Sequence, residues 1–249
     1  MEANLGHRPV DSHYRLNKSG DKLSHIETIG DAVLYLGNAL DIAPTLSRDC
    51  AVIADVPYGI NANTKARSSK RVGAVESRHA GNPILQDFPV IEGDDKPFDP
   101  TVWLSYPEVI LFGANYFCDR LPPSSKWLVF DKRRGNTSDD NADCEIAWTN
   151  IKGPARLFSH LWRGMVRDSE TGQKKVHPTQ KPIPLMRWCI EQVKAMTILD
   201  PYMGSGTTGV ACLQLGRKFL GVEIDPVYFD TACRRIEAAI KVPELALSK

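Results

Sequence analysis

Short apolar runs alternate along the chain with segments whose apolar residues recur every three to four positions. Four runs have the length and composition of buried strands: 31–37, 50–60, 197–200 and 218–225. Helical stripes follow Pro182, Thr207 and Pro226, and a short helix is expected over 40–46. Strands that alternate with helices predict an α/β fold with a mostly parallel sheet.

The middle and the beginning of the chain have weaker patterns. A helix followed by a strand is expected over 99–118, with further strands over 126–132 and 144–150. Residues 1–30 lack a clear period and predict an N-terminal arm, which leaves 31–249 as one domain.

The composition is that of an ordinary globular protein, with 42% hydrophobic and 24% charged residues among 249. No apolar run reaches the roughly 18 residues of a membrane helix, and the N-terminus lacks the apolar core of a signal peptide. We therefore expect a cytoplasmic protein without membrane contact. The six cysteines form no C-x-x-C pair, which argues against a zinc site and against a disulfide framework.

Charge is segregated although the net charge is only +1. Residues 61–80 carry five basic side chains and one acidic one, and residues 152–176 carry six basic and two acidic ones. Two such basic segments are expected where a protein meets a polyanion such as nucleic acid. Two solvated loops would give the same pattern.

A glycine-rich turn, DPYMGSGTTG, joins the strand at 197–200 to the next helix. Glycines there let a ligand approach the backbone, and the N-terminus of the helix offers N–H groups to it. Glu223 ends the next strand, 19 residues after Gly204, where an acidic residue binds ribose hydroxyls. The turn and the acid predict an adenosine-containing cofactor, either a dinucleotide or S-adenosylmethionine, while a purely structural turn would look similar.

The tetrapeptide Asp55-Val56-Pro57-Tyr58 follows an apolar strand, so we expect it at the carboxyl edge of the sheet, where ligands bind. Val56 precedes a proline and is biased toward an extended backbone, which can turn its carbonyl outward. A carboxylate, a free carbonyl and an aromatic ring in a row can hold a planar ring that carries an amine. An ordinary turn at the end of a strand is the alternative interpretation.

Three segments together resemble the β class of amino-directed DNA methyltransferases, particularly phage and prophage adenine-N6 methylases: ADVPYGI, HPTQKP at 177–182, and ILDPYMGSGTTGVA with GVEID. The resemblance spans roughly 31–240. It implies a Rossmann-like methyltransferase fold with a permuted motif order and helices on both faces of the sheet. One departure is Val56, where the family usually has proline. Because the family's contact there is a backbone carbonyl, we expect altered rigidity and retained activity.

The resemblance also implies residue roles, with S-adenosylmethionine as methyl donor. Asp55 and the Val56 carbonyl accept hydrogen bonds from the target amine, and Tyr58, after Pro57, stacks on a base flipped out of duplex DNA. The implied cofactor site comprises Asp55, His177, Thr179, Gln180, Lys181, Asp200, Gly204, Ser205, Gly206, Thr207 and Glu223. No metal is expected at His177, because no second ligand has suitable spacing.

Asp55 at the first position of the tetrapeptide favours N6 of adenine over N4 of cytosine in this family. The sequence argues against a C5-cytosine methylase, because the nucleophilic cysteine of that family follows a proline and no cysteine does so here.

Double-stranded DNA is the implied partner, in a bacterial or phage-infected bacterial cell, and a homodimer is compatible with the resemblance. The segments at about 61–100 and 152–176, inserted between the motifs, are candidates for DNA contact. The basic residues expected to bind DNA are Lys65, Arg67, Lys70, Arg71, Arg78 and Arg163.

Three other functions stay open. An NAD-dependent dehydrogenase would use the glycine turn but leaves DVPY and HPTQKP unexplained. A non-catalytic nucleic-acid binder would retain the fold, although the intact Asp55 and Tyr58 argue against it. Methylation of RNA or of a protein glutamine uses related tetrapeptides, but the permuted motif order argues against that class.

Neutralising Lys65, Arg67, Lys70 and Arg71 together is expected to weaken DNA binding and to flatten its dependence on salt. A protein with fewer phosphate contacts displaces fewer counterions from the DNA when it binds. The measurement is the dissociation constant for a DNA duplex over a series of salt concentrations. An unchanged slope would show that these residues do not contact phosphates.

Overall fold

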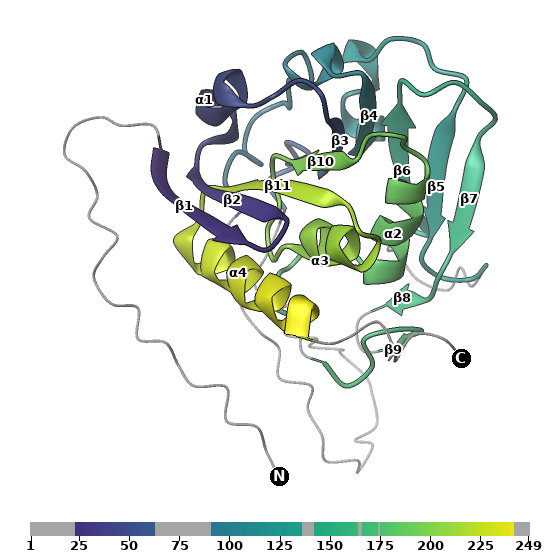
Figure 1. Cartoon of the computed structure of the whole chain (residues 1–249). Coiled ribbons are helices and arrows are strands. Elements are labelled where there is room, and N and C mark those ends of the chain that lie inside the picture. The colour runs from purple at the N-terminus through teal and green to yellow at the C-terminus, as the bar shows by residue number, and fades with distance from the viewer. Residues whose placement is uncertain (1–22, 63–90, 136–141, 164–165, 174, 242–249) are drawn as a thin grey trace.

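The structure, a computed structural model, describes residues 23–62, 91–135, 142–163, 166–173 and 175–241 (Figure 1). The strands of the main sheet are β1 Leu23–Ile29, β2 Ala32–Gly37, β3 Ala51–Asp55, β4 Glu108–Phe112, β5 Trp127–Asp131, β6 Cys144–Thr149, β7 Arg156–Ser159, β10 Thr197–Asp200 and β11 Lys218–Glu223. Their order across this nine-stranded sheet is β1-β2-β11-β10-β3-β4-β6-β5-β7. A separate hairpin is formed by β8 Trp162–Arg163 and β9 Val166–Arg167.

The centre of the sheet is parallel. β2, β11, β10, β3 and β4 run in one direction. At the two sides of this parallel centre, β1 pairs antiparallel with β2 and β6 pairs antiparallel with β4. β10 and β11 come last in the sequence yet lie between β2 and β3, so C-terminal strands complete the middle of the sheet. The predicted mostly parallel sheet and the permuted order are both present.

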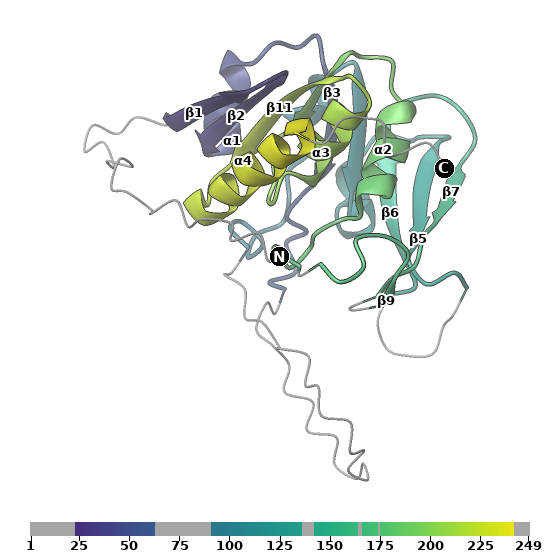
Figure 2. The same cartoon turned by 60° about the horizontal axis from the view of Figure 1, so that its bottom comes forward.

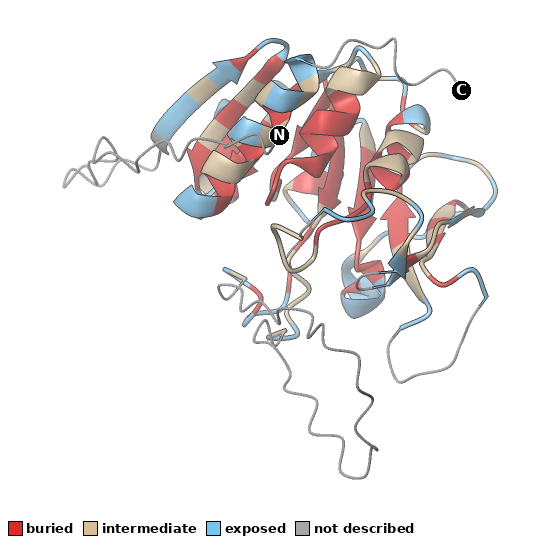
Figure 3. Ribbon diagram, turned by 90° about the horizontal axis from the view of Figure 1, so that it is seen from below, coloured by how far each residue is buried: buried red, intermediate tan, exposed pale blue. Residues whose placement is uncertain are grey.

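Two layers cover the sheet (Figures 2 and 3). The helices are α1 Ala39–Ile42, α2 Ile183–Glu191, α3 Thr207–Gln214 and α4 Pro226–Lys241. α2, α3 and α4 bury Leu185, Ala211 and Ile236 against one face of the sheet, whereas α1 and short 3-10 turns cover the other face around Trp103 and Tyr106. Because both faces are covered, the central strands are mostly apolar between their ends, and residues 51–54 of β3 are all buried. None of the described helices is long and apolar enough to cross a membrane.

The strand candidate within 99–118 is shorter than expected. β4 ends at Phe112 because Gly113 adopts a left-handed conformation with φ 74°, and 3-10 turns follow at 114–116 and 118–120. The helix expected before this strand is only a 3-10 turn, Trp103–Ser105.

The expected organisation of two segments also changes. The arm expected over 1–30 is wrong for 23–29, which form β1 and pair with β2; residues 1–22 lie outside the described part. The segment 152–176 is not wholly an insertion, since it contains β7, which pairs with β5 at the edge of the main sheet, as well as the small hairpin.

The start of α3 lies directly against α4. Gly206, the residue before α3, has φ 75°, and a Cβ atom there would lie 2.8 Å from Ala232 Cβ and 3.0 Å from Ala232 Cα. Gly216, just beyond the end of α3, has a similar φ of 62°, but a Cβ there would meet no atom within 4 Å. Both positions favour glycine by conformation, and only Gly206 is also required by packing.

Gly206→Ala is therefore expected to lower the free energy of unfolding by about 1–3 kcal/mol more than Gly216→Ala, since overpacking adds to a shared backbone cost. The measurement is urea unfolding of both variants. Equal losses would contradict the close packing of α3 on α4.

Candidate active site

The carboxyl ends of the central parallel strands border a pocket of about 640 Å³. The structure brings together there the three motifs that are far apart in the sequence: Asp55–Tyr58 at the end of β3, most of 177–181 before α2, and the turn from Asp200 to Thr208. Glu223, at the end of β11, lines the same pocket. This is the edge at which open α/β sheets bind ligands.

Two buried acidic side chains shape the glycine turn. Asp200 accepts hydrogen bonds from the Thr208 hydroxyl (2.5 Å) and the Tyr202 N–H (3.1 Å). Glu223 accepts one from the Gly204 N–H (2.9 Å) and one from the Asp225 N–H (2.8 Å). Burial raises the pKa of both carboxyl groups to about 7, against the lowering effect of these hydrogen bonds.

The rest of the turn is held from outside the pocket by Arg235, on α4. Its guanidinium donates to the Ser205 carbonyl (2.7 Å), the Ser205 hydroxyl (2.8 Å) and the Thr207 hydroxyl (3.0 Å). Ser205 and Thr207 line the pocket, whereas Gly206 is directed at α4. Nothing in the sequence singles out Arg235 among the polar positions of an amphipathic helix.

Asp55 belongs to a charge cluster of half-buried side chains around the buried Lys181. Its Oδ1 accepts a hydrogen bond from the Tyr58 hydroxyl (2.6 Å), and its Oδ2 lies 2.5 Å from Lys181 Nζ. Lys181 Nζ also lies 2.9 Å from Glu145 Oε2, and Lys132 Nζ lies 3.1 Å from Glu145 Oε1. Lys181 thus contacts the tetrapeptide carboxylate, a contact that the implied cofactor role does not include.

The sequence reasoning missed Glu145 and Lys132. Glu145 is near the start of β6, and Lys132 follows β5 directly. A single Glu at a strand start and a Lys after a strand resemble solvated positions, so the only available signal was a charged residue at the start of an otherwise apolar strand candidate.

Burial and charge act against each other at Asp55. Burial raises the pKa of Asp55, nearby Lys181 lowers it, and Glu145 raises it again. Burial and the neighbouring Asp55 carboxylate raise the pKa of Tyr58 well above its ordinary value, so the phenol stays protonated and donates its hydrogen bond.

The ring of Tyr58 has close neighbours. It stacks on Tyr116 with ring centroids 5.2 Å apart and an interplanar angle of 19°. It also lies against Gly113, where any Cβ would collide with it. Val56, in the position of the missing proline, is buried in the core at 3% exposure, and Pro57 lines the pocket.

The 177–181 segment closes one side of the pocket. The His177 ring packs edge-on against Tyr228 (4.3 Å between centroids), and its Nδ1 lies 3.3 Å from the Thr179 N–H, which donates to it. The Gln180 side chain anchors the segment by two hydrogen bonds: its amide oxygen accepts from the Val176 N–H, and its amide nitrogen donates to Glu170.

Of the predicted DNA-binding residues, the structure describes Arg163 alone. Lys65, Arg67, Lys70, Arg71 and Arg78 lie outside the described residues, and Arg163 is exposed on β8.

Of 61–100, the structure describes 61–62 and 91–100. There, buried Asp94 accepts hydrogen bonds from the N–H groups of Gly59 (2.9 Å), Ile60 (3.4 Å) and Ala62 (2.7 Å), which ties the chain after Tyr58 to the pocket rim. Sequence reasoning did not single out Asp94.

Comparison with known protein families finds a match for one part of the chain. Residues 123–234 match the model of an N6/N4 methyltransferase family described as DNA methylase. This part of the chain is similar to DNA methylases. It includes Glu145, Lys181, Asp200 and Glu223 but not the tetrapeptide.

Two relatives are similar over part of their length. The type II methyltransferase M2.DpnII of Streptococcus pneumoniae is 39% identical over 85 residues, 33% of this chain and 32% of that protein. The type II methyltransferase M2.LlaDCHI of Lactococcus lactis subsp. cremoris is 38% identical over 124 residues, 49% of this chain and 45% of that protein. The chain therefore matches less than half the length of each.

A solved structure confirms the fold. The PvuII DNA methyltransferase, titled cytosine-N4-specific, superposes with a TM-score of 0.51 at 13% identity, over 88% of this chain and 90% of that one. The predicted Rossmann-like methyltransferase fold is thus confirmed by a likeness that extends over most of both chains.

Asp200 and His177 predict opposite effects of pH on stability. Burial raises the pKa of Asp200 to about 7, so the folded state binds more protons than the unfolded chain and this carboxyl group favours folding less as pH rises from about 4 to about 7. Burial, helped by Lys181, lowers the pKa of His177 to about 3. The unfolded chain then binds the extra proton, so the imidazole favours folding more as pH rises to about 6.5.

As pH rises from about 5 to about 8, the free energy of unfolding of Asp200→Asn is expected to increase relative to wild type by on the order of 2 kcal/mol. The amide keeps an oxygen for the Tyr202 N–H, and its nitrogen can donate to Thr208. Urea unfolding across this pH range measures the difference. His177→Asn serves as the opposite control and should lose stability relative to wild type over the same range. Curves parallel to wild type for both variants would contradict the burial effects.

Proposed function

We propose that this protein is a DNA methyltransferase that moves a methyl group from S-adenosylmethionine to the N6 amine of a flipped adenine in duplex DNA. The observation that carries the proposal is the shared pocket, because the Asp55 carboxylate and the glycine turn face the same cavity at one edge of the sheet. The match of residues 123–234 to DNA methylases supports DNA as the substrate class.

The pocket suits the proposed cofactor. When bound, S-adenosylmethionine supplies a methyl group on a positively charged sulfur, which leaves as a thioether once the methyl group has moved. The cavity of about 640 Å³ is within the roughly 300–1,000 Å³ typical of small-molecule sites. Carboxyl groups of Asp55, Asp200 and Glu223 line it, which suits a cation.

Glu223 is proposed to bind the ribose hydroxyls. Each of its oxygens already accepts one backbone N–H and keeps a further lone pair for a hydroxyl donor. The further proposed cofactor contacts are His177, Thr179, Gln180, Lys181, Gly204, Ser205, Gly206 and Thr207.

The protein holds the target amine and accommodates its proton. The Asp55 carboxylate and the Val56 carbonyl accept the two amine hydrogens, which directs the nitrogen lone pair away from them. As the nitrogen bonds to the methyl carbon it loses one proton, and Asp55 is the nearest base. The Tyr58 hydroxyl, bonded to Asp55 at 2.6 Å, orients the carboxylate.

A base has to leave the helix to reach this pocket, at a cost of a few kcal/mol. Tyr58 is the proposed stacking partner for the flipped base. Its ring stacks on Tyr116, a residue that is 51% exposed and has to move aside if the base uses that face. The basic residues proposed from the sequence would hold the DNA backbone.

Adenine is proposed over cytosine because the tetrapeptide begins with Asp55. N4 of cytosine is the alternative, since the same acceptors can hold either exocyclic amine.

The reaction is tested by incubating the protein with methyl-labelled S-adenosylmethionine and unmethylated duplex DNA, and then digesting the DNA to nucleosides. Label in N6-methyladenine is expected. Asp55→Asn should lose at least about 100-fold in rate, because the amide offers an N–H to the amine where an acceptor is needed. Asp119→Asn, whose side chain is 77% exposed, is the matched control and should keep the wild-type rate.

The outcomes separate the alternatives. Label in N4-methylcytosine would keep the proposed site and overturn the choice of base. Absence of label from DNA would overturn the proposed function, as would equal rates for Asp55→Asn and wild type.

A further inference from the structure

Four charged side chains form a continuous chain from the pocket toward the surface: Asp55, Lys181, Glu145 and Lys132. Successive charged atoms lie 2.5, 2.9 and 3.1 Å apart. The Lys181 side chain, second in this chain, is only 7% exposed, while that of Lys132, the last, is 22% exposed. The two negative and two positive groups balance, as buried charges require.

The topology of the sheet brings these groups together. β6 runs antiparallel to β4 and β5, so its first residues lie at the same edge as the last residues of the parallel strands. In that register Glu145 pairs with Phe130, two residues before Lys132, and Asp55 pairs with Phe112 on β4. Lys181, from the segment before α2, then inserts its amine between the two acids.

We infer that Lys181 and Glu145 are positioning residues that act through Asp55: Lys181 keeps the Asp55 carboxylate ionised and aimed, and Glu145 holds Lys181 in place and limits its effect. The use of that carboxylate on an amine rests on the proposed function. Its charge state is a property of the protein alone and can be measured without substrate.

An ionised Asp55 needs this support. A carboxylate taken out of water without a cation takes up a proton, and a protonated carboxyl group presents a donor where an amine needs an acceptor. Burial raises the pKa of Asp55, whereas Lys181 lowers it both by its charge and by its hydrogen bond. Within the described residues, Lys181 is the cation paired with Asp55.

Other charged and titratable groups surround this pair. Among the described residues, those whose charge or hydrogen bond acts on Asp55, Lys181 or Glu145, or is acted on by them, include Tyr58, Lys132, Lys175, His177, Cys189 and Asp200, and Tyr116 acts on Tyr58. Lys132 and Lys175 are the further cations, and the charge of each acts on Glu145 or Lys181. Replacing Lys181 thus removes the cation that contacts Asp55. Lys132 remains, but it pairs with Glu145 and does not contact Asp55 directly.

The two positioning residues predict opposite shifts. Lys181→Gln leaves Asp55 beside the negative Glu145, so Asp55 should bind its proton more tightly. Glu145→Gln removes that negative charge and leaves Lys181 to Asp55 alone, so Asp55 should bind its proton more weakly. A Lys181 that served only to hold a cofactor would not give the rise in Lys181→Gln in the protein without ligands.

The direct test is a pH titration of the Asp55 carboxyl carbon by NMR in aspartate-labelled protein, with the signal assigned from Asp55→Asn. The expected result is at least about a tenfold rise in proton affinity for Lys181→Gln and a fall for Glu145→Gln. Lys181→Arg keeps the charge and should restore a midpoint near wild type.

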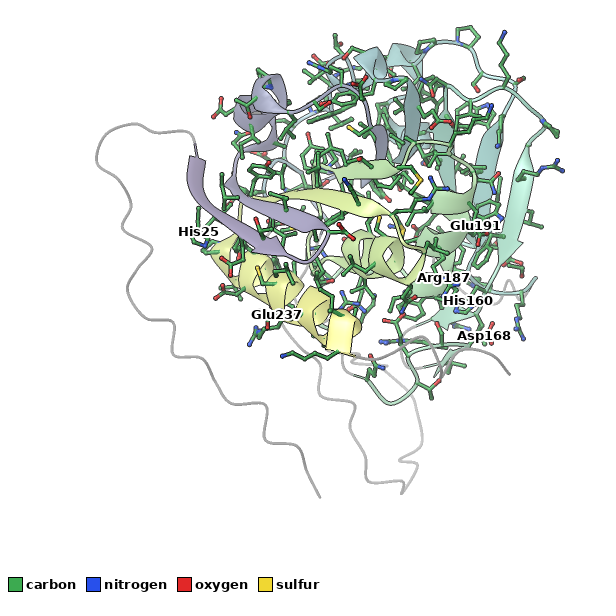
Figure 4. The ribbon with its side chains drawn as sticks, viewed as in Figure 1. His25, His160, Asp168, Arg187, Glu191 and Glu237 are labelled. Carbon is green, nitrogen blue, oxygen red and sulfur yellow. The ribbon has the colours of Figure 1, made fainter. Side chains whose placement is uncertain are left out.

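Two exposed positions supply matched controls. Lys218→Gln, on β11, and Glu191→Gln, on α2 (Figure 4), repeat the same substitutions away from the cluster and should leave the Asp55 titration unchanged.

An Asp55 midpoint that stays at the wild-type value in Lys181→Gln would overturn the inference, as would shifts of the same sign in the two variants. If Lys181→Gln does not fold, the fall for Glu145→Gln and the wild-type midpoint of Lys181→Arg decide the question.

Single-turnover methyl transfer as a function of pH gives a second readout. The acidic limb of the rate profile should move to higher pH in Lys181→Gln and to lower pH in Glu145→Gln. A wild-type protein that transfers no methyl group would defeat the proposed function, while the NMR titration would still decide the inference.

Discussion

The ion pair between Asp55 and Lys181 is the constraint on which the rest of the site depends. It joins the end of β3 to a segment more than a hundred residues later in the chain, in a region where neither charge can reach bulk water freely. The cost of burying two charges is offset only when geometry and further partners are right. Tyr58 and Glu145 supply those partners, so the cluster functions as a unit.

The sheet topology places the members of this cluster at one edge of the sheet. Asp55, Asp200 and Glu223 lie at one edge because each ends a parallel central strand. Glu145 lies at the same edge because β6 is antiparallel and begins there. The glycine turn then gains its shape from the two buried acids on one side and from Arg235 on the other. Pocket and fold are therefore stabilised by the same contacts.

Local patterns in the sequence were sufficient for most elements. Apolar runs and glycine punctuation predict β3, β10 and β11, and the helices α3 and α4 that follow the last two, because these signals depend on neighbours in the chain. Glu145 and Arg235 could not be predicted, since their roles depend on strand pairing and helix packing over long separations. Lys181 was assigned to the cofactor by motif alone, whereas its ion pair with Asp55 is set by tertiary structure.

The central claim is that one pocket serves both the methyl donor and the target amine. The most direct test is a crystal structure of the protein with a non-reactive analogue of S-adenosylmethionine and a duplex containing its target base. We expect an extruded base whose amine nitrogen lies within about 3.2 Å of an Asp55 oxygen, with the analogue on the glycine turn beside Glu223. An analogue bound elsewhere, or a base amine that does not contact Asp55, would contradict that claim.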